Sequence, residues 1–221
     1  MRPRSRAGQQ LSVLLLAVAV ALGLGACGAP SGPSAGGLDS PDDRGVVRAE
    51  PVAQPTPARA ATPQRWRRDV NRVMKGSGAY LGRRAERAEP GVRLAVNLDV
   101  DNTMLASTYD PGAAVRPVLR FTRRAQREGV AVLVNTARGQ ESLAKTRRQL
   151  RRAGYVVDGL CLRAPDLGVV EGKQACRAGY RDRGYRLVAN VGNRSTDFVR
   201  AQGEAGWGRT FDLPDYGNTL G

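Results

Sequence analysis

Two short stretches of the chain combine oxygen-bearing side chains at close spacing. Asp99 and Asp101 follow a largely apolar run, and Asn193 and Asp197 follow a second one. Carboxylate and amide oxygens are the ligands that hard cations such as Mg²⁺ prefer. A single pair of aspartates is also common in solvated turns, and that alternative is disfavoured here because matching polar groups recur further along the chain.

The rest of the composition narrows the chemistry. The chain has 221 residues and no histidine, which excludes Ser-His-Asp and Cys-His nucleophile pairs, phosphohistidine enzymes and His-ligated zinc. Lys173 supplies a positive charge that could neutralise an anion beside the aspartates. A carboxylate nucleophile, a metal ion and a lysine suit phosphoryl transfer, which depends on positioning and charge neutralisation.

Apolar runs and helical periods alternate along residues 64–221. Strands are expected at 92–100, 130–136, 155–162, 185–191 and 209–213. Helices are expected at 64–88, 111–128, 141–153, 172–183 and, at least in part, 197–203. This alternation predicts an α/β fold of three layers, Rossmann-like, in which helices cover both faces of a parallel five-stranded sheet.

Sites in such sheets form at the carboxyl ends of the strands. The first strand leads into Asp99 and Asp101, the second ends in residues 135–138, and the fourth leads into Asn193 and Asp197. Lys173 lies at the start of the helix that precedes the fourth strand. We therefore expect these residues to gather at one edge of the sheet.

Four segments, taken as an ordered set, resemble the haloacid dehalogenase (HAD) superfamily. They are LAVNLDVDNTML (94–105), VAVLVNTARG (130–139), EGKQACRAGYRDRGYRLVANVGNRSTDF (171–198) and FDLPDYGN (211–218). Within the superfamily the chain is similar to subfamily IIIB, the acid phosphatase branch that includes bacterial class C lipoprotein acid phosphatases and plant vegetative storage proteins. The resemblance spans residues 74–218 and is specific only as a set.

The resemblance implies a role for each matching residue. Asp99 would be the nucleophile that forms an aspartyl-phosphate. Asp101 would be the general acid towards the leaving alcohol and then the base towards water, and its backbone carbonyl would bind the metal. Lys173 would neutralise charge on the nucleophile and the phosphate. Thr136 would hydrogen-bond the phosphoryl group, in a substrate-binding segment with Ala137 and Arg138.

The resemblance also implies that Asp99, Asp101, residue 193 and Asp197 hold Mg²⁺. The family pattern there is Gly-Asp-x-x-x-Asp, whereas this chain has Gly192-Asn193 before Asp197. We expect weaker metal binding, or metal held mainly by Asp99, the Asp101 carbonyl and Asp197. A catalytically weakened binding module on the same fold is the alternative that this departure raises.

Other side chains near the site have two interpretations. Arg138 and Arg177 could bind substrate anions, or they could be solvated or ion-paired. Asn102 and Thr103 are expected to shape the turn, and Trp66 and Trp207 to pack.

The gaps at 104–110 and 139–172 are too short for a cap domain, so we expect an open site with loose specificity. Its substrate could be a nucleotide, a sugar phosphate or a phosphorylated macromolecule. The helix at 64–88 could cover part of the crevice.

The N-terminal residues have the pattern of a targeting signal. Three arginines precede an apolar run at 11–24, which is too short for a confident membrane span and typical of a signal peptide. The run ends in Gly25-Ala26-Cys27, which resembles a bacterial lipobox; an ordinary signal peptide with an incidental cysteine is the alternative. We predict a lipoprotein signal peptide at 1–26, lipidation of Cys27, a Pro/Ala/Gly-rich disordered tether over 27–63, and a phosphatase domain over 64–221.

This signal peptide predicts a protein that is anchored by lipid to the extracytoplasmic face of the cell membrane, or secreted if the lipobox is not used. Cys161 and Cys176 remain, and in an exported protein they could form a disulfide or stay as two free thiols. The oligomeric state is left open.

The formal net charge is +15, and residues 64–221 hold 29 basic and 16 acidic residues. Such charge can indicate nucleic-acid or other anion binding at the cell surface, but a bias towards arginine on solvated faces is the favoured explanation. Aromatic residues are only 5% of the chain, too few for a base-stacking surface, so no specific nucleic-acid partner is expected. The favoured function is an exported, Mg²⁺-dependent acid phosphatase that hydrolyses phosphomonoesters.

Overall fold

The computed structural model of the protein describes residues 62–216. The predicted signal peptide at 1–26, Cys27 and the tether up to residue 61 lie outside the described residues and stay predictions. Within 62–216, no helix has the length and apolar character needed to cross a membrane.

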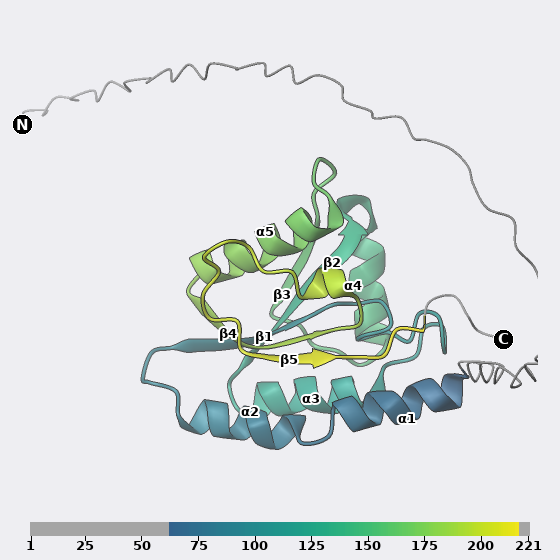
Figure 1. Ribbon diagram of the computed structural model, residues 1–221, viewed down its shortest axis with the longest axis horizontal. Helices are drawn as coiled ribbons and strands as arrows, with labels where there is room; N and C mark the ends of the chain where they lie inside the picture. The colour runs from purple at the N-terminus through teal and green to yellow at the C-terminus, as the bar shows by residue number, and fades with distance from the viewer. Residues whose placement is uncertain (1–61, 217–221) are drawn as a thin grey trace, which may run out of the picture. The chain divides into compact units, whose positions relative to one another are not determined.

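The described residues form the expected parallel sheet (Figure 1). Its five strands lie in the order β3-β2-β1-β4-β5, and each neighbouring pair is parallel. The strands are β1 Arg93–Leu98, β2 Ala131–Gly139, β3 Gly159–Arg163, β4 Tyr185–Gly192 and β5 Arg209–Asp212. β1 lies at the centre, and all but its first residue are buried, as expected for a strand covered on both faces.

Helices cover both faces and complete the three layers. They are α1 Pro63–Val73, α2 Ser77–Glu86, α3 Arg116–Arg127, α4 Leu143–Arg152 and α5 Val169–Asp182, with short 3₁₀ turns η1 Gln140–Ser142 and η2 Ser195–Asp197. Figure 1 shows α1, α2 and α3 on one face and α5 on the other. The α/β fold class is confirmed, and right-handed crossovers explain why α5, which leads back from β3 to β4, lies opposite α3.

The core follows the same division. The larger cluster of buried side chains packs α1, α2 and α3 against the sheet and includes Trp66, Leu81 and Phe121. A smaller cluster lies beneath α5, where Tyr180 packs with Leu133 of β2. Because the α5 cluster is small, other contacts must help to hold this helix on the sheet.

The expected single helix over 64–88 is wrong, because the chain forms α1 and α2 with a turn between them. Gly76 has a φ of +78°, a left-handed conformation that favours glycine and ends a helical run. Thr62 caps α1 by accepting a hydrogen bond from the backbone N–H of Arg65 at 3.2 Å.

Two other expected helices differ from the structure. The helix expected from 111 begins only at Arg116, because the chain before it folds back: the N–H of Val115 donates to the carbonyl of Met104 at 2.9 Å. The helix expected over 197–203 is limited to the turn η2, and the chain then runs as a loop to β5. In both places long-range hydrogen bonds outweigh the local helical tendency.

The remaining expected elements are present with bounds shifted by a few residues. β3 shows the largest shift, since Tyr155 to Asp158 are outside it and the strand begins at Gly159. Residues 99–115 form a loop, and residues 140–168 hold only η1, α4, β3 and short loops. Neither segment contains an additional domain, so the described residues have little or no cap, as expected.

Candidate active site

Three charged side chains meet at the carboxyl edge of the sheet. Lys173 of α5 donates to Oδ1 of Asp99 at 2.8 Å and also contacts Oδ1 of Asp197. All three residues are buried, with 3–7% of their surface exposed. The structure therefore brings together residues that are 24 and 74 positions apart in the chain.

The backbone fixes both carboxylates. The N–H of Asp99 donates to the carbonyl of Val191 at 3.0 Å, which ties the end of β1 to β4. Oδ2 of Asp197 accepts the N–H groups of Asn193 and Arg194, each at 2.9 Å. Gly192 is needed for this turn, because a Cβ there would lie 2.4 Å from Oδ2 of Asp197.

Burial sets the electrostatics of the cluster. It is the main reason that the pKa of Asp99 rises to about 6; Lys173 opposes the rise and Asp197 adds to it. Burial alone would lower the pKa of Lys173, but Asp99 and Asp197 outweigh it and hold that pKa above its usual value. The lysine therefore stays charged, and a further cation near Asp99 would favour its ionised form.

Asp101 is held in a different environment. Arg138 donates two hydrogen bonds to its carboxylate, from Nε to Oδ2 at 2.8 Å and from Nη2 to Oδ1 at 2.6 Å. Ser107 donates to the same carboxylate at 2.5 Å. Burial raises the pKa of Asp101, but the hydrogen bonds from Arg138 and Ser107 outweigh it, so the pKa lies below its usual range.

The predicted substrate segment 136–138 follows β2 at the same edge. Thr136 is buried, and its Oγ1 accepts the N–H of Arg138 at 3.3 Å. The carbonyl of Ala137 accepts from Arg163 of β3 at 3.1 Å. Arg138 also contacts Gln149 of α4 at 2.6 Å, so its guanidinium bridges Asp101 and that helix. Arg138 was expected either to bind a substrate anion or to be solvated or ion-paired, and in the structure it is ion-paired with Asp101.

Arg177 is also ion-paired. It is fully buried, and its Nε donates to Oε1 of Glu204 at 2.8 Å. It is therefore not placed to bind a substrate anion, and the ion-pair interpretation is the correct one. Trp66 packs as expected in the core, whereas Trp207 is half-buried and stacks on Arg177, with 4.8 Å between the guanidinium and the ring centre.

The donor atoms suit a hard cation but are few. Within 62–216, no group of three or more His, Cys, Asp or Glu side chains could hold a metal ion. The buried oxygen donors here are the carboxylates of Asp99 and Asp197 and the amide oxygen of Asn193. The backbone carbonyl of Asp101 is the fourth donor that the resemblance implies. Asn193 is 4% exposed, and its Oδ1 accepts from the Thr103 hydroxyl at 3.2 Å. All four donors are oxygen atoms, which fits Mg²⁺ chemically.

Comparison with known proteins connects this geometry to a family. The family model of the HAD superfamily, subfamily IIIB (acid phosphatase), matches residues 110–219. This segment of the chain, just under half of its length, is therefore similar to that family. No curated protein matches the sequence at a significant level.

Two solved structures share the fold. The class C acid phosphatase from Bacillus anthracis matches with a TM-score of 0.50 and 18% identity, over 61% of this chain and 65% of that one. The same kind of enzyme from that organism with tungstate bound matches with a TM-score of 0.53 and 16% identity, over 68% of this chain and 78% of that one. In the first comparison this chain therefore spans slightly less than two thirds of the matched protein.

Sequence patterns indicate Asn135 but not two other neighbours of the site, Ser107 and Glu204. Ser107 contacts Asp101, and Glu204 pairs with Arg177. Ser107 and Glu204 lie in loops that carry no motif. Asn135 is among the polar residues expected at the end of the second strand, and it donates to the carbonyl of Lys173 at 2.9 Å.

Proposed function

We propose that this protein is a Mg²⁺-dependent acid phosphatase, exported and anchored by lipid, which hydrolyses phosphomonoesters through an aspartyl-phosphate. The buried contact of Lys173 with both Asp99 and Asp197 carries the proposal. Burying an ammonium with two carboxylates is costly, and a site that binds a phosphate dianion explains why such a cluster is kept at the sheet edge.

Asp99 is the nucleophile. One of its carboxylate oxygens attacks phosphorus, an O–P bond forms, and the bond from phosphorus to the alcohol oxygen breaks. Asp101 gives a proton to the departing alcohol and then takes one from the water that attacks the aspartyl-phosphate. Phosphate leaves and Asp99 is restored. Lys173 neutralises negative charge on Asp99 and on the phosphoryl oxygens throughout the reaction.

The ion pair between Arg138 and Asp101 affects the proton transfers that Asp101 makes in this reaction. A carboxylate paired with a guanidinium holds a proton poorly, so Asp101 must leave Arg138 to serve as an acid. Asp101 is suited to move, because its side chain is 44% exposed. The phosphate dianion then replaces Asp101 as the partner of Arg138, beside Thr136.

Asp99, Asp197, Asn193 and the Asp101 carbonyl would hold Mg²⁺. The ion, when bound, supplies positive charge that reduces the repulsion between the Asp99 carboxylate and a phosphate dianion. The protein's own residues fix the nucleophile, carry the proton and orient the phosphoryl group.

The substrate class follows from the lack of a cap. No inserted domain covers the carboxyl edge in the described residues, so the site accepts phosphomonoesters with varied leaving groups, such as nucleotides, sugar phosphates or phosphorylated macromolecules. The disulfide between Cys161 and Cys176 supports export, because such bonds persist in oxidising compartments. Lipidation at Cys27 rests on the sequence alone.

The test is hydrolysis of a chromogenic aryl phosphate by the full chain, from acid to neutral pH, with Mg²⁺ and with a chelator. We expect metal-dependent turnover that falls by at least about a thousandfold in Asp99→Asn. Asp166→Asn is the matched control, because Asp166 is exposed in the loop between β3 and α5. Equal turnover in wild type and Asp99→Asn would refute the proposal.

Asn193 gives one specific reason to keep a second candidate function, a binding module on this fold. A folded, metal-loaded protein without turnover, which gains turnover in Asn193→Asp, would establish that the site has weakened. A protein that binds phosphate but gains no turnover from this substitution would be a binding module.

A further inference from the structure

Lys173 reaches the carboxylates from a helix, whereas Asp99 and Asp197 follow strands of the sheet. A lysine side chain has a flexible four-carbon stem, so its ammonium is only as well placed as the backbone that carries it. The part of α5 around Lys173 must therefore be fixed on the sheet, although the apolar cluster beneath this helix is small.

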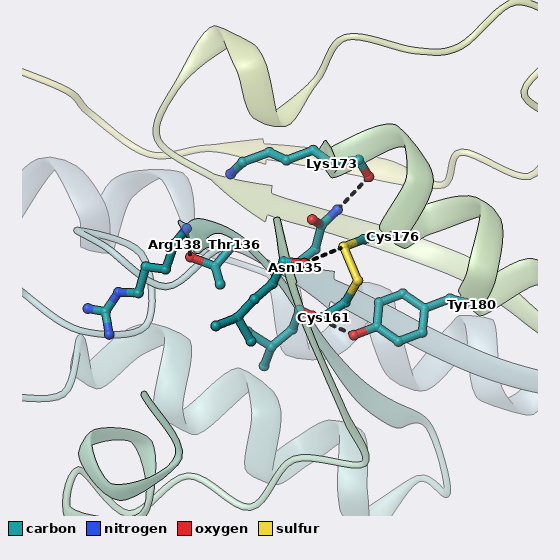
Figure 2. Close-up of a disulfide and its surroundings, with 9 residues drawn as sticks. Asn135, Thr136, Arg138, Cys161, Lys173, Cys176 and Tyr180 are labelled. Carbon is teal, nitrogen blue, oxygen red and sulfur yellow. Dashed lines mark hydrogen bonds between the residues drawn. A yellow bond between two sulfur atoms is a disulfide. The ribbon is translucent and has the colours of Figure 1, made fainter. Parts of the chain in front are cut away.

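Two contacts hold the part of the helix around Lys173 (Figure 2). Cys176, one helical turn after Lys173, forms a disulfide with Cys161 of β3. Asn135 of β2 donates its amide N–H to the backbone carbonyl of Lys173 itself at 2.9 Å, and both residues are buried. A covalent bond and a buried hydrogen bond thus tie the backbone around Lys173 to two neighbouring strands.

Close packing reinforces this attachment. A Cβ at Gly172 would lie 2.7 Å from Cγ of Arg163, so α5 approaches β3 closely beside Lys173. Beyond Cys176 the helix has separate contacts: the hydroxyl of Tyr180 donates to the carbonyl of Val134 at 2.5 Å, and Arg177 pairs with Glu204. Loss of the disulfide would therefore loosen the part of α5 around Lys173 before the part that follows Cys176.

We propose that the Cys161–Cys176 disulfide, together with Asn135, is a positioning element that holds Lys173 between Asp99 and Asp197. Breaking the disulfide releases the lysine from the carboxylates while the domain stays folded. The kinetic part of this inference rests on the proposed phosphatase function, because a displaced Lys173 no longer neutralises the nucleophile and phosphate. A displacement of about 1 Å is enough to slow such a reaction by about a hundredfold.

The lysine content gives a direct readout that does not need activity. The chain has only three lysines, Lys75, Lys145 and Lys173, so a protein labelled with ¹⁵N at lysine Nζ gives at most three ammonium signals. The buried, hydrogen-bonded ammonium of Lys173 exchanges its protons slowly, whereas Lys75 and Lys145 are exposed. Lys173→Arg assigns the signal.

The experiment compares the oxidised full chain, the chain reduced with a phosphine, the variant Cys161→Ala/Cys176→Ala, and Asn135→Ser. Tyr180→Phe is the matched control, because it removes a hydrogen bond from the far half of the same helix. Spectra, melting temperature, kcat and KM for an aryl phosphate are measured well below each melting temperature.

We expect the slowly exchanging signal in oxidised protein and in Tyr180→Phe, and its loss from the folded reduced protein and from the double variant. We expect kcat to fall at least tenfold in these two while KM stays within twofold, and Asn135→Ser to show a smaller effect of the same kind. An unchanged signal in folded reduced protein, or equal losses in Tyr180→Phe, would overturn the inference. If the oxidised chain hydrolyses no phosphomonoester, the proposed phosphatase function fails. The ammonium signal alone then decides whether the disulfide positions Lys173.

If the double variant does not fold, reduction and Asn135→Ser still test the inference, since neither removes a side chain from the core cluster.

Discussion

At the scale of single residues, burial makes the charges of the site depend on one another. Lys173 is shared by Asp99 and Asp197, so each carboxylate has only part of its charge neutralised. Asn193 adds an amide where the family pattern has a third carboxylate, which leaves the site with less negative charge. The metal affinity should be the property most sensitive to this difference.

Asn193→Asp is expected to raise the affinity for Mg²⁺ about tenfold, which corresponds to about 1.4 kcal/mol, because it adds a charged oxygen donor. Calorimetric titration of metal-free protein measures this directly. Asn71→Asp adds the same charge on an exposed face of α1 and should leave the affinity unchanged. Equal affinities for wild type and Asn193→Asp would exclude residue 193 from the metal site.

Glu204 provides a second test at this scale, through stability. Burial raises its pKa, but hydrogen bonds from Arg177, the N–H of Ala201 and Arg181 outweigh burial and hold the pKa below its usual value. A carboxyl with a lowered folded pKa contributes stability above its unfolded pKa, about 4.3, and this contribution is lost as the pH falls through the folded value.

We therefore expect Glu204→Gln to lower the free energy of unfolding by about 3 kcal/mol at pH 7, because two arginines lose their partner. The difference from wild type should shrink below about pH 4, because Glu204 then takes up a proton in the unfolded state before it does so in the folded state. Urea unfolding at a series of pH values measures both. A difference that stays constant down to pH 3 would contradict the assigned ion pair.

At the scale of elements, the N-terminal helices lie away from the carboxylates. α1 packs by Trp66, which stacks on Tyr109 with 4.4 Å between ring centres and donates its Nε1–H to the carbonyl of Pro214 at 3.1 Å. A cavity of about 650 Å³ lies between α1 and the start of α3 and includes Arg116 and Arg120 in its lining. This cavity is separate from Asp99 and Lys173.

Trp66→Ala should cost about 3–5 kcal/mol of stability, because it removes a buried ring and leaves a cavity. We expect kcat to stay within twofold of wild type below the melting temperature, since α1 covers the α3 face of the sheet. Thermal unfolding and steady-state kinetics measure the two effects. A large fall in kcat in the folded variant would mean that α1 does shape the site.

The elements that sequence patterns predicted poorly have one cause in common. The expected helices from 111 and over 197–203 were placed by local signals, such as the turn at Pro111-Gly112. In the structure these segments are held by distant partners: the carbonyl of Met104 accepts the N–H of Val115, and the carbonyl of Val199 accepts from Arg177 of α5 at 2.5 Å. Such partners are invisible in a window of a dozen residues.

At the scale of the whole molecule, the positive charge of the described domain is concentrated on exposed helices. α3 and α4 present ten exposed basic residues between them, five on each helix. α4 follows the segment 136–138 of the site after the short turn η1, so its first turn begins near the carboxyl edge. A basic surface of this kind attracts anionic substrates over several ångströms.

We expect kcat/KM for a dianionic phosphomonoester to fall several-fold as ionic strength rises from about 0.02 M to about 0.5 M, while kcat changes little, because salt screens long-range attraction. Arg147→Glu/Arg151→Glu on α4 should lower kcat/KM at low salt and flatten this dependence. The same salt dependence in the variant as in wild type would show that α4 does not steer substrate.

The sequence by itself determined the α/β class, the parallel sheet and the positions of Asp99, Asp101, Lys173 and Asp197 along it. These follow from local information: apolar periodicity marks the strands, and polar residues that end parallel strands must meet at one edge. The break between α1 and α2 depends on Gly76, whose left-handed conformation ends the first helical run.

The tertiary structure alone decided which side chains share a partner. The two arginines flagged near the site, Arg138 and Arg177, have the same charge and similar neighbours in the sequence. One pairs with Asp101 beside the predicted phosphate position, and the other is buried with Glu204 beneath α5. The pairing of Cys161 with Cys176 was left open for the same reason. Such contacts depend on how a helix lies on a sheet to within an ångström, and this is set by packing across the whole domain.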